Sequence, residues 1–315
     1  MSRARELADS YTDNEVDSKP SGFKNYIING DFDIWQRGTQ FEFTAETHRY
    51  HADRWLTAQF GSGGTQTISQ ITSLVDGGND YVLRCFQTTA CNNKTVQILD
   101  NYSSKSLRGR KMTVSFWYRA KGGISSLIIQ RTDTQTYSSE FASNTPEGSG
   151  TIIGASSGLT SDETWRYASY TTVTTHQNGY FHLVFSQPVA INDYYEIARV
   201  QVEEGSVATP FEQRPYGLEL SLCQRYYEVV TGYIRNDYRS DAVATFGSAI
   251  SYKQSKRGVP ILTKITESYS GATAGLIDVI GSSLEAAVVT ATGSVTIGGQ
   301  ITQSYHVLFS ASAEL

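Results

Sequence analysis

The sequence predicts an all-β protein made of two β-rich modules. Three observations lead to this prediction: short runs of β-branched and aromatic residues recur along the chain, clusters of Gly, Asn, Asp and Ser separate these runs, and a Pro-containing stretch divides them into two sets. The composition agrees, because the 315 residues include 20 Tyr and 27 Gly but only 2 Met. Aromatic and β-branched side chains favour strands, whereas Gly and small polar residues favour turns.

Residues 1–22 form the first predicted segment, and they are polar. Residues 3–9 would form about two helical turns with Ala4, Leu7 and Ala8 on one side. A helix this short is marginally stable alone, so it needs a partner or copies of itself to pack against. A frayed tail is the alternative interpretation.

Residues 23–204 are predicted to form a jelly roll or another β-sandwich. Turn-forming clusters such as 76–80 and 177–179 separate its apolar runs, and no amphipathic helix of useful length interrupts them. The strand-like runs are 26–29, 68–71, 81–86, 95–99, 111–119, 127–130, 165–173, 180–185 and 194–202. Many short strands with such turns are typical of two packed antiparallel sheets.

The run 111–119 is the clearest strand, because its side chains alternate in character. One face carries Met112, Val114, Phe116 and Tyr118. The other carries Thr113, Ser115, Trp117 and Arg119. We expect the first face to be buried.

Residues 205–216 are predicted to be a linker, because Pro210 and Pro215 fix the backbone and remove hydrogen-bond donors. Apolar residues then recur at every fourth position, which predicts a helix of about two to three turns that carries Leu218, Leu222, Tyr226 and Val230.

Residues 217–315 are predicted to form a second, β-sandwich tip domain that begins with this short helix. Its strand-like runs are 244–252, 260–267, 276–280, 287–290, 294–297 and 305–310. Before the first of them, an aromatic and charged loop is expected to contain Tyr233, Arg235, Asp237, Tyr238 and Arg239.

The charge balance argues against nucleic acid as a partner. The chain has 26 Lys and Arg against 31 Asp and Glu, a formal net charge of −5, and its basic group at 108–111 is short. Neutralising phosphates requires a clustered basic face. No apolar leader opens the chain, and Gly and polar residues break the uncharged run between Glu285 and Glu314, so neither a secretory signal nor a membrane helix is predicted.

The cysteines Cys85, Cys91 and Cys223 are odd in number, so they cannot all pair within one chain. Cys85 and Cys91 are close enough in sequence to pair across a hairpin. Reduced thiols are the expected state for a protein made in a cytosol.

Few residues have the spacing of a catalytic or metal site. Residues 154–158 fit the G-x-S-x-G pattern, but a serine nucleophile needs a helix after it, and a turn is expected here. His48, His51 and Asp53 are too loosely spaced for zinc. The carboxylate pairs are close in sequence only: Asp31 with Asp33, and Glu203 with Glu204. We therefore expect no catalytic residue, metal or cofactor.

Aromatic residues give the strongest chemical signal. Sugar rings stack their C–H patches on Trp and Tyr, and polar side chains bind the hydroxyl groups. The candidate pairs for such contacts are Trp117 with Arg119, Trp165 with Tyr167, and Tyr180 with His182. Packing inside the core is the alternative role for each aromatic ring.

Several stretches resemble the tail fibres of bacteriophages and prophages. YIINGDFDIWQRG at 26–38 and HADRW at 51–55 are similar to the opening of a jelly-roll domain in these fibres. VQVEEGSVATPFEQRP at 200–215, running into CQRYY at 223–227, is similar to the close of that domain and its joint to the tip. The ending ASAEL at 311–315 also resembles such fibres.

This resemblance implies a domain similar to carbohydrate-binding modules in a non-enzymatic, homotrimeric fibre. The fibre would be made in the host cytoplasm and carried in the virion tail. Residues 1–22 would attach it to a tail or baseplate protein. It would bind bacterial surface polysaccharide or lipopolysaccharide through the tip loop described above or, alternatively, through Trp117 and Arg119. The trimer interface is expected to contain Leu7, Leu218, Leu222 and Tyr226.

The resemblance also bears on calcium. Related sugar-binding modules often hold Ca²⁺ between a carboxylate in the first strand and an acidic residue in the last strand. Asp33 matches the first position, but Ala198 and Arg199 stand at the second. We therefore expect Arg199 to pair with Asp33 in place of an ion.

Two other functions remain open at this point. The chain could be an enzyme that depolymerises capsule polysaccharide, or a purely structural subunit of the tail or baseplate.

Overall fold

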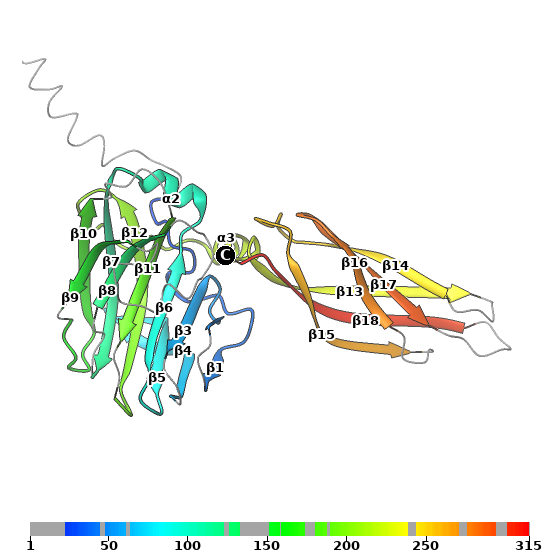
Figure 1. The fold of residues 1–315 in the computed structure, drawn as a ribbon, viewed down its shortest axis with the longest axis horizontal. Helices are drawn as coiled ribbons and strands as arrows, with labels where there is room; N and C mark the ends of the chain where they lie inside the picture. The colour runs from blue at the N-terminus through cyan, green and yellow to red at the C-terminus, as the bar shows by residue number, and fades with distance from the viewer. Residues whose placement is uncertain are drawn as a thin grey trace, which may run out of the picture. The chain divides into compact units, whose positions relative to one another are not determined.

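A computed structural model describes residues 23–44, 48–60, 64–122, 126–132, 151–157, 159–173, 180–187, 190–238, 244–270, 276–293 and 301–314 (Figure 1). The chain divides into two compact units, and the division falls between Pro215 and Tyr216. Leu7 and the rest of segment 1–22 lie outside the described residues, as does the predicted strand 294–297. No described helix is long and apolar enough to cross a bilayer.

The first unit contains two six-stranded antiparallel sheets that pack face to face. Sheet A has the strand order β1 (Gln40–Phe43), β4 (Gln66–Val75), β5 (Gly78–Gln87), β12 (Tyr194–Glu204), β7 (Lys111–Lys121) and β10 (Arg166–Val173). Sheet B has the order β2 (His48–Tyr50), β3 (Trp55–Phe60), β6 (Asn92–Ile98), β11 (Tyr180–Gln187), β8 (Ser126–Thr132) and β9 (Thr151–Ser157).

Helix α2 (Asn101–Leu107) connects β6 to β7, so the chain passes from sheet B to sheet A. Its N-cap is Asp100, whose carboxylate accepts a hydrogen bond from the Ser103 backbone N–H at 2.8 Å. Such a cap satisfies one of the N–H groups that have no partner within the helix.

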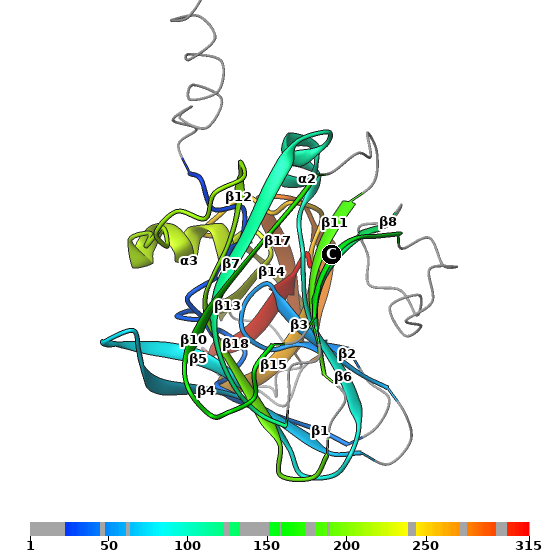
Figure 2. The same ribbon diagram turned by 90° about the vertical axis from the view of Figure 1, so that its left-hand side faces the viewer.

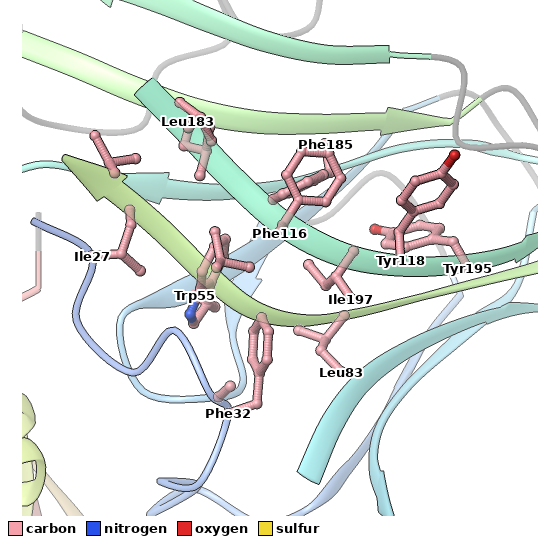
Figure 3. Close-up of a cluster of buried hydrophobic side chains, with 14 of the residues drawn as sticks. Ile27, Phe32, Trp55, Leu83, Phe116, Tyr118, Leu183, Phe185, Tyr195 and Ile197 are labelled. Atoms are coloured by element: carbon pink, nitrogen blue, oxygen red, sulfur yellow. The ribbon is translucent and has the colours of Figure 1, made fainter. Parts of the chain in front are cut away.

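The core lies between the two sheets and is rich in aromatic rings (Figure 3). Phe116 of β7 and Phe185 of β11 meet edge to face across it, with ring centroids 5.0 Å apart. Burial of one such ring contributes about 1.5–3 kcal/mol. The predicted alternation of β7 is confirmed, because Met112, Val114, Phe116 and Tyr118 all belong to this core.

The predicted strand at 26–29 is wrong as a strand. The segment does run beside β12, because the Tyr26 N–H donates a hydrogen bond to the Val202 carbonyl oxygen, 2.8 Å away. However, Asn29 adopts the left-handed conformation with φ 58°. A side chain at Gly30 would lie 2.2 Å from the Val200 carbonyl oxygen. The backbone therefore turns away here, and only Gly allows this close approach.

The predicted linker 205–216 is attached to the first unit for most of its length. The Glu203 carboxylate accepts hydrogen bonds from the Thr209 backbone N–H and hydroxyl. The Glu212 carboxylate accepts from the backbone N–H groups of Lys24 and Asn25, at 3.2 and 2.9 Å. These contacts join the segment that enters the unit to the segment that leaves it.

Arg214 completes this junction. Its buried guanidinium donates to the backbone carbonyls of Ile27 and Asn25 and stacks over the ring of Phe23. We call the junction the terminal clamp, and it consists of Lys24, Asn25, Glu203, Thr209, Glu212 and Arg214.

The second unit begins with helix α3 (Tyr216–Gln224) and contains two three-stranded antiparallel sheets. One has the order β13 (Tyr227–Tyr238), β18 (Ile301–Ser312) and β15 (Ile261–Ser270); the other has β14 (Ala244–Ser251), β17 (Ala286–Gly293) and β16 (Leu276–Ser282). Both sheets contribute to one small core, which contains Val230, Ile250, Tyr252, Ala287, Val307, Phe309 and Ala311.

The predicted helix is correct only in its first half. Helix α3 ends at Gln224, and β13 begins at Tyr227, so Tyr226 and Val230 are not helical. Aromatic and β-branched residues favour a strand, and β13 gains a partner in β18. Tyr226 is fully buried, so it has no exposed surface for the predicted trimer interface. Leu218 and Leu222 lie on α3 and are half-buried.

Candidate functional site

The side of sheet A that points away from the core, which we call the outer face, gathers aromatic and charged side chains from several strands. Trp117 and Arg119 lie on β7 in the strand phase opposite to the core residues. Tyr167 of β10 pairs directly with Trp117, and Glu196 of β12 pairs with both Arg119 and Arg84 of β5. The register therefore places these side chains in two adjacent rows across the sheet.

The aromatic row contains Trp117, Tyr167 and the neighbouring Trp165. The rings of Trp117 and Tyr167 are tilted, with centroids 5.6 Å apart. Tyr167 remains 48% exposed, so its ring is accessible to a ligand. Trp117 and Trp165 are partly buried, because they pack against a small apolar cluster formed by Ile71, Val75, Val82 and Ala198.

The outer face is strongly curved. The Trp165 indole N–H beside β10 donates to the Ser73 hydroxyl of β4 at 3.1 Å. In the sheet order, β7, β12 and β5 lie between those strands, which would separate them by about 19 Å in a flat sheet. The β4–β5 hairpin must therefore bend toward β10, and it runs at a steep angle to β7 and β10 (Figure 2).

Arg199 fastens this hairpin to β12. It lies at an irregularity in the β12–β7 register and has a left-handed φ of 47°. Its guanidinium approaches Asp80 at 2.7 Å and Asp76 at 3.8 Å. The expected pair with Asp33 is therefore wrong, because the bulge turns Arg199 to the outer face. The prediction that Asp33 holds no calcium is not tested by this pairing.

The charged row is centred on Glu196, which is fully buried. Arg119 holds one carboxylate oxygen through two nitrogens, at 2.7 and 2.6 Å. Arg84 approaches the other oxygen at 3.7 Å, too far for a hydrogen bond. Burial raises the pKa of Glu196, and the two arginines partly oppose that shift. The row thus carries two positive charges against one negative charge.

Aromatic rings support both guanidinium groups. Arg119 lies 5.2 Å from the centroid of Trp165, and Arg84 lies 4.5 Å from that of Tyr194. The Tyr194 hydroxyl donates to Glu163 at 3.1 Å. Cation–π contacts of this kind fix the planes of the guanidinium groups. The outer face therefore combines accessible aromatic surface with oriented hydrogen-bond donors.

The structure brings together two of the predicted pairs and excludes the histidine of the third. Trp117, Arg119, Trp165 and Tyr167 share the outer face. His182 on β11 is fully buried, so the predicted contact of Tyr180 and His182 with sugar is wrong for the histidine.

The predicted tip loop is wrong as a loop, because most of it belongs to β13. Tyr233, Arg235, Asp237 and Tyr238 pair in register with His306, Ser304, Thr302 and Ile301 of β18. Tyr233 is 55% exposed. Arg239 lies outside the described residues.

The other residues considered for chemistry have structural roles. Residues 154–157 lie within strand β9 rather than in the predicted turn, so the serine motif does not form the strand–turn–helix elbow that a nucleophile needs. Asp53 accepts hydrogen bonds from Gln36 and Arg37. Within the described residues, no three His, Cys, Asp or Glu side chains group as metal ligands do.

The cysteines Cys85, Cys91 and Cys223 are free and buried. The Gln87 amide lies between the first two: it accepts from the Cys91 thiol at 2.8 Å and donates to the Cys85 sulfur at 3.8 Å. Burial raises the pKa of both thiols. The hairpin pairing considered from the sequence is therefore wrong for this structure.

Sequence reasoning missed Arg84, Tyr194 and Glu196. A signal was present, because charged residues interrupt the apolar runs at 81–86 and 194–202, and Arg84 and Glu196 lie in the phase that points away from the core. Buried charges in otherwise apolar strands require partners, so the sequence indicates that Arg84 and Glu196 each need a partner, but it does not indicate that they pair with each other.

No family model matches the sequence, and no curated protein matches it. Solved structures give distant likenesses. Tailspike protein 4 of bacteriophage CBA120, in its enzymatically active domain, has 14% identity over 58% of this chain and 22% of that chain, with a TM-score of 0.38. This chain therefore corresponds to less than a quarter of that tailspike's length.

Two carbohydrate-binding modules are also similar. TmCBM61, solved in complex with β-1,4-galactotriose, has 11% identity over 58% of this chain and all of that chain, with a TM-score of 0.34. The xylan-binding CBM22-1 domain of Paenibacillus barcinonensis Xyn10C has 11% identity over 53% and 95%, with a TM-score of 0.32. TM-scores this low do not indicate a ligand, so what the outer face binds must be inferred from its own side chains.

Proposed function

We propose that this chain is a glycan-binding protein and that the outer face is its binding surface. The observation that carries the proposal is the convergence of Trp117, Trp165 and Tyr167 with Arg84 and Arg119 on one curved side of sheet A. Aromatic rings take the C–H faces of sugars, and the guanidinium groups donate to their oxygens. The curvature lets side chains from distant strands contact the same short saccharide.

The broader biological role belongs to the same proposal. The stretches 26–38 and 200–215 resemble phage and prophage tail fibres, which supports a role in adsorption to bacterial surface polysaccharide or lipopolysaccharide. The protein would act by binding rather than by catalysis, as a homotrimer in the virion tail. Several weak sites on one particle would then bind a repetitive surface with high avidity.

The outer face is preferred to the tip strand as the binding surface. On β13, Tyr233 is exposed, but the described tip candidates all come from this one strand. The outer face instead gathers side chains from β5, β7, β10 and β12. A broad surface contacts more of a ligand.

A double substitution tests this assignment. We expect Trp117→Ala with Tyr167→Ala to weaken binding to bacterial surface polysaccharide at least tenfold, because losing aromatic contact of about 1.5 kcal/mol or more changes affinity by that factor. Binding would be measured on immobilised polysaccharides from candidate hosts, together with the thermal unfolding of each variant.

Tyr81→Ala provides the matched control. Tyr81 is 47% exposed, close to the 48% of Tyr167, but it points to the opposite side of the same sheet. We expect its removal to leave binding unchanged. Full binding by the folded double variant would contradict the assignment to the outer face, and loss of binding with Tyr233→Ala would move the site to β13. Release of new reducing ends would indicate a depolymerase, and failure to bind any polysaccharide would favour a structural subunit.

A further inference from the structure

Ring contacts hold the guanidinium group of Arg84 in place, and it donates no hydrogen bond to any residue that the structure describes. Its Nε is buried and has no hydrogen-bond partner among the described residues. Within the described part of the chain, its one carboxylate contact is with Glu196, 3.7 Å away. The group is instead held by ring contacts, with centroids at 4.5 Å for Tyr194 and 5.7 Å for Phe86. The side chain as a whole is one third exposed, so a ligand can reach it.

Charge counting shows that Arg84 is also electrically uncompensated. Arg119 takes Glu196 through two nitrogens, which leaves the second arginine without a carboxylate of its own. Nearby acids have other partners: the described contacts join Asp80 to Arg199, Asp162 to Arg166, and Glu163 to the Tyr194 hydroxyl. The row Arg84–Glu196–Arg119 therefore has a net charge of +1.

An arginine fixed in this way matches one kind of group closely. A guanidinium presents parallel N–H donors in one plane, and a carboxylate accepts two of them at once. A sugar phosphate often carries two negative charges and usually gathers several cations, whereas this row has one positive charge to spare. A sugar carboxylate, with a single negative charge and a flat shape, fits better.

Arg84 lies close enough to the aromatic rings of the outer face for one saccharide to contact both. Arg84 lies on β5 and Trp117 on β7, with β12 between them, so about 10 Å separates their strands. An oligosaccharide lying across the strands would meet both residues. Its carboxylate would face Arg84 while a neighbouring sugar ring contacts Trp117 and Tyr167.

We propose that the outer face selects carboxylated saccharides, such as polymers that contain uronic acids, and that Arg84 is the residue that binds the carboxylate. This inference rests on the proposed glycan-binding function. It narrows that function from saccharides in general to acidic ones.

The test uses an immobilised panel of bacterial surface polysaccharides, some neutral and some rich in uronic acid. Each acidic member is also presented in its carboxyl-reduced form, in which the uronic acid has become the neutral sugar. We expect the full-length protein to bind acidic members at least tenfold more tightly than their reduced forms. Arg84→Gln should remove that difference, and Arg84→Lys should restore only part of it because the planar fork is lost.

Arg166→Gln is the control for a general loss of positive charge. Arg166 is the first residue of β10, is 43% exposed and pairs with Asp162. It lies in the strand phase opposite to Tyr167. It should leave the preference unchanged, and melting temperatures should show that every variant is folded.

Equal binding of acidic and reduced forms would overturn the role of the carboxylate, as would an unchanged preference in folded Arg84→Gln. Binding to neutral members alone would overturn this inference while leaving the glycan-binding proposal in place. Binding to no member would defeat both.

Discussion

His51 shows how a single buried residue links this fold to pH. The ring is fully buried, its Nδ1 accepts a hydrogen bond from the Ala52 N–H, and its Nε2 lies 2.8 Å from the Thr57 hydroxyl. Burial, followed by the charges of Arg37 and Arg49, lowers its pKa from 6.5 to about 3. The imidazole is therefore neutral in the folded protein, with its proton on Nε2.

This shift predicts a loss of stability in acid. Because the folded pKa lies below the unfolded value, the unfolded state binds the proton first as pH falls from 6.5 toward 3. In that window, His51 should remove about 1.4 kcal/mol of unfolding free energy per pH unit. Urea unfolding at several pH values, compared with His51→Gln, would isolate this slope from that of the carboxylates. Identical slopes would show that the ring is protonated in the fold.

The core-facing residues of β7 were predicted from the sequence, but the polar side chains of the outer face were only partly predicted. Alternation placed Phe116 inward and Trp117 outward, since the period of a strand is local information. The pairing of Arg84 with Glu196 depends on which strands become neighbours. That choice is made by the whole sheet and leaves no spacing in the sequence.

At the scale of elements, the β4–β5 hairpin determines the curvature of the outer face. Its connection to β12 depends on Arg199, which reaches Asp80, Asp76 and the Val75 carbonyl. The strained φ of 47° persists because these contacts compensate for it.

We expect Arg199→Ala to loosen this hairpin without unfolding the first unit. Amide hydrogen exchange at 73–80 should accelerate at least tenfold, and binding to polysaccharide should weaken because the hairpin no longer approaches Trp165. Arg110→Ala, which removes an exposed pair with Glu204, serves as the control and should change neither property. Unchanged exchange in Arg199→Ala would mean that the Trp165–Ser73 bond and the apolar cluster hold the hairpin without Arg199.

Elements with strong periodicity were predicted well, and elements defined by their partners were not. The runs that became β4, β5, β7 and β12 were found within a few residues. The predicted helix was extended too far, because Tyr226 and Val230 continue the apolar spacing of α3 by chance. Val230 pairs with β18, and the Tyr226 carbonyl accepts from the Ala313 N–H just after β18, so these long-range contacts decide their conformation. The short strands β1, β2 and β3 and the edge strand β9 were missed, since long-range pairing rather than local pattern defines them.

At the scale of the whole molecule, the proposed homotrimer can be tested at helix α3. The observed end of this helix decides which of the predicted interface residues to substitute. Of the predicted interface residues, Leu218 and Leu222 lie on α3 with part of their surface exposed, whereas Tyr226 is buried. If α3 contributes to the interface, Leu218→Glu with Leu222→Glu should convert trimers to monomers, because charges would enter an apolar contact. Sedimentation equilibrium would measure this change. Tyr216→Glu, at an exposed position of the same helix, is the control. A wild-type monomer at micromolar concentration would contradict the trimer.

The terminal clamp has a mechanical consequence. Because Lys24 and Asn25 are bound directly to Glu212 and Arg214, a pull on the chain ahead of Phe23 and behind Pro215 is transmitted across a few neighbouring hydrogen bonds. The sheets lie outside that path. A load applied between these two points would stress this short junction first, and the sandwich would keep its shape until the junction ruptured.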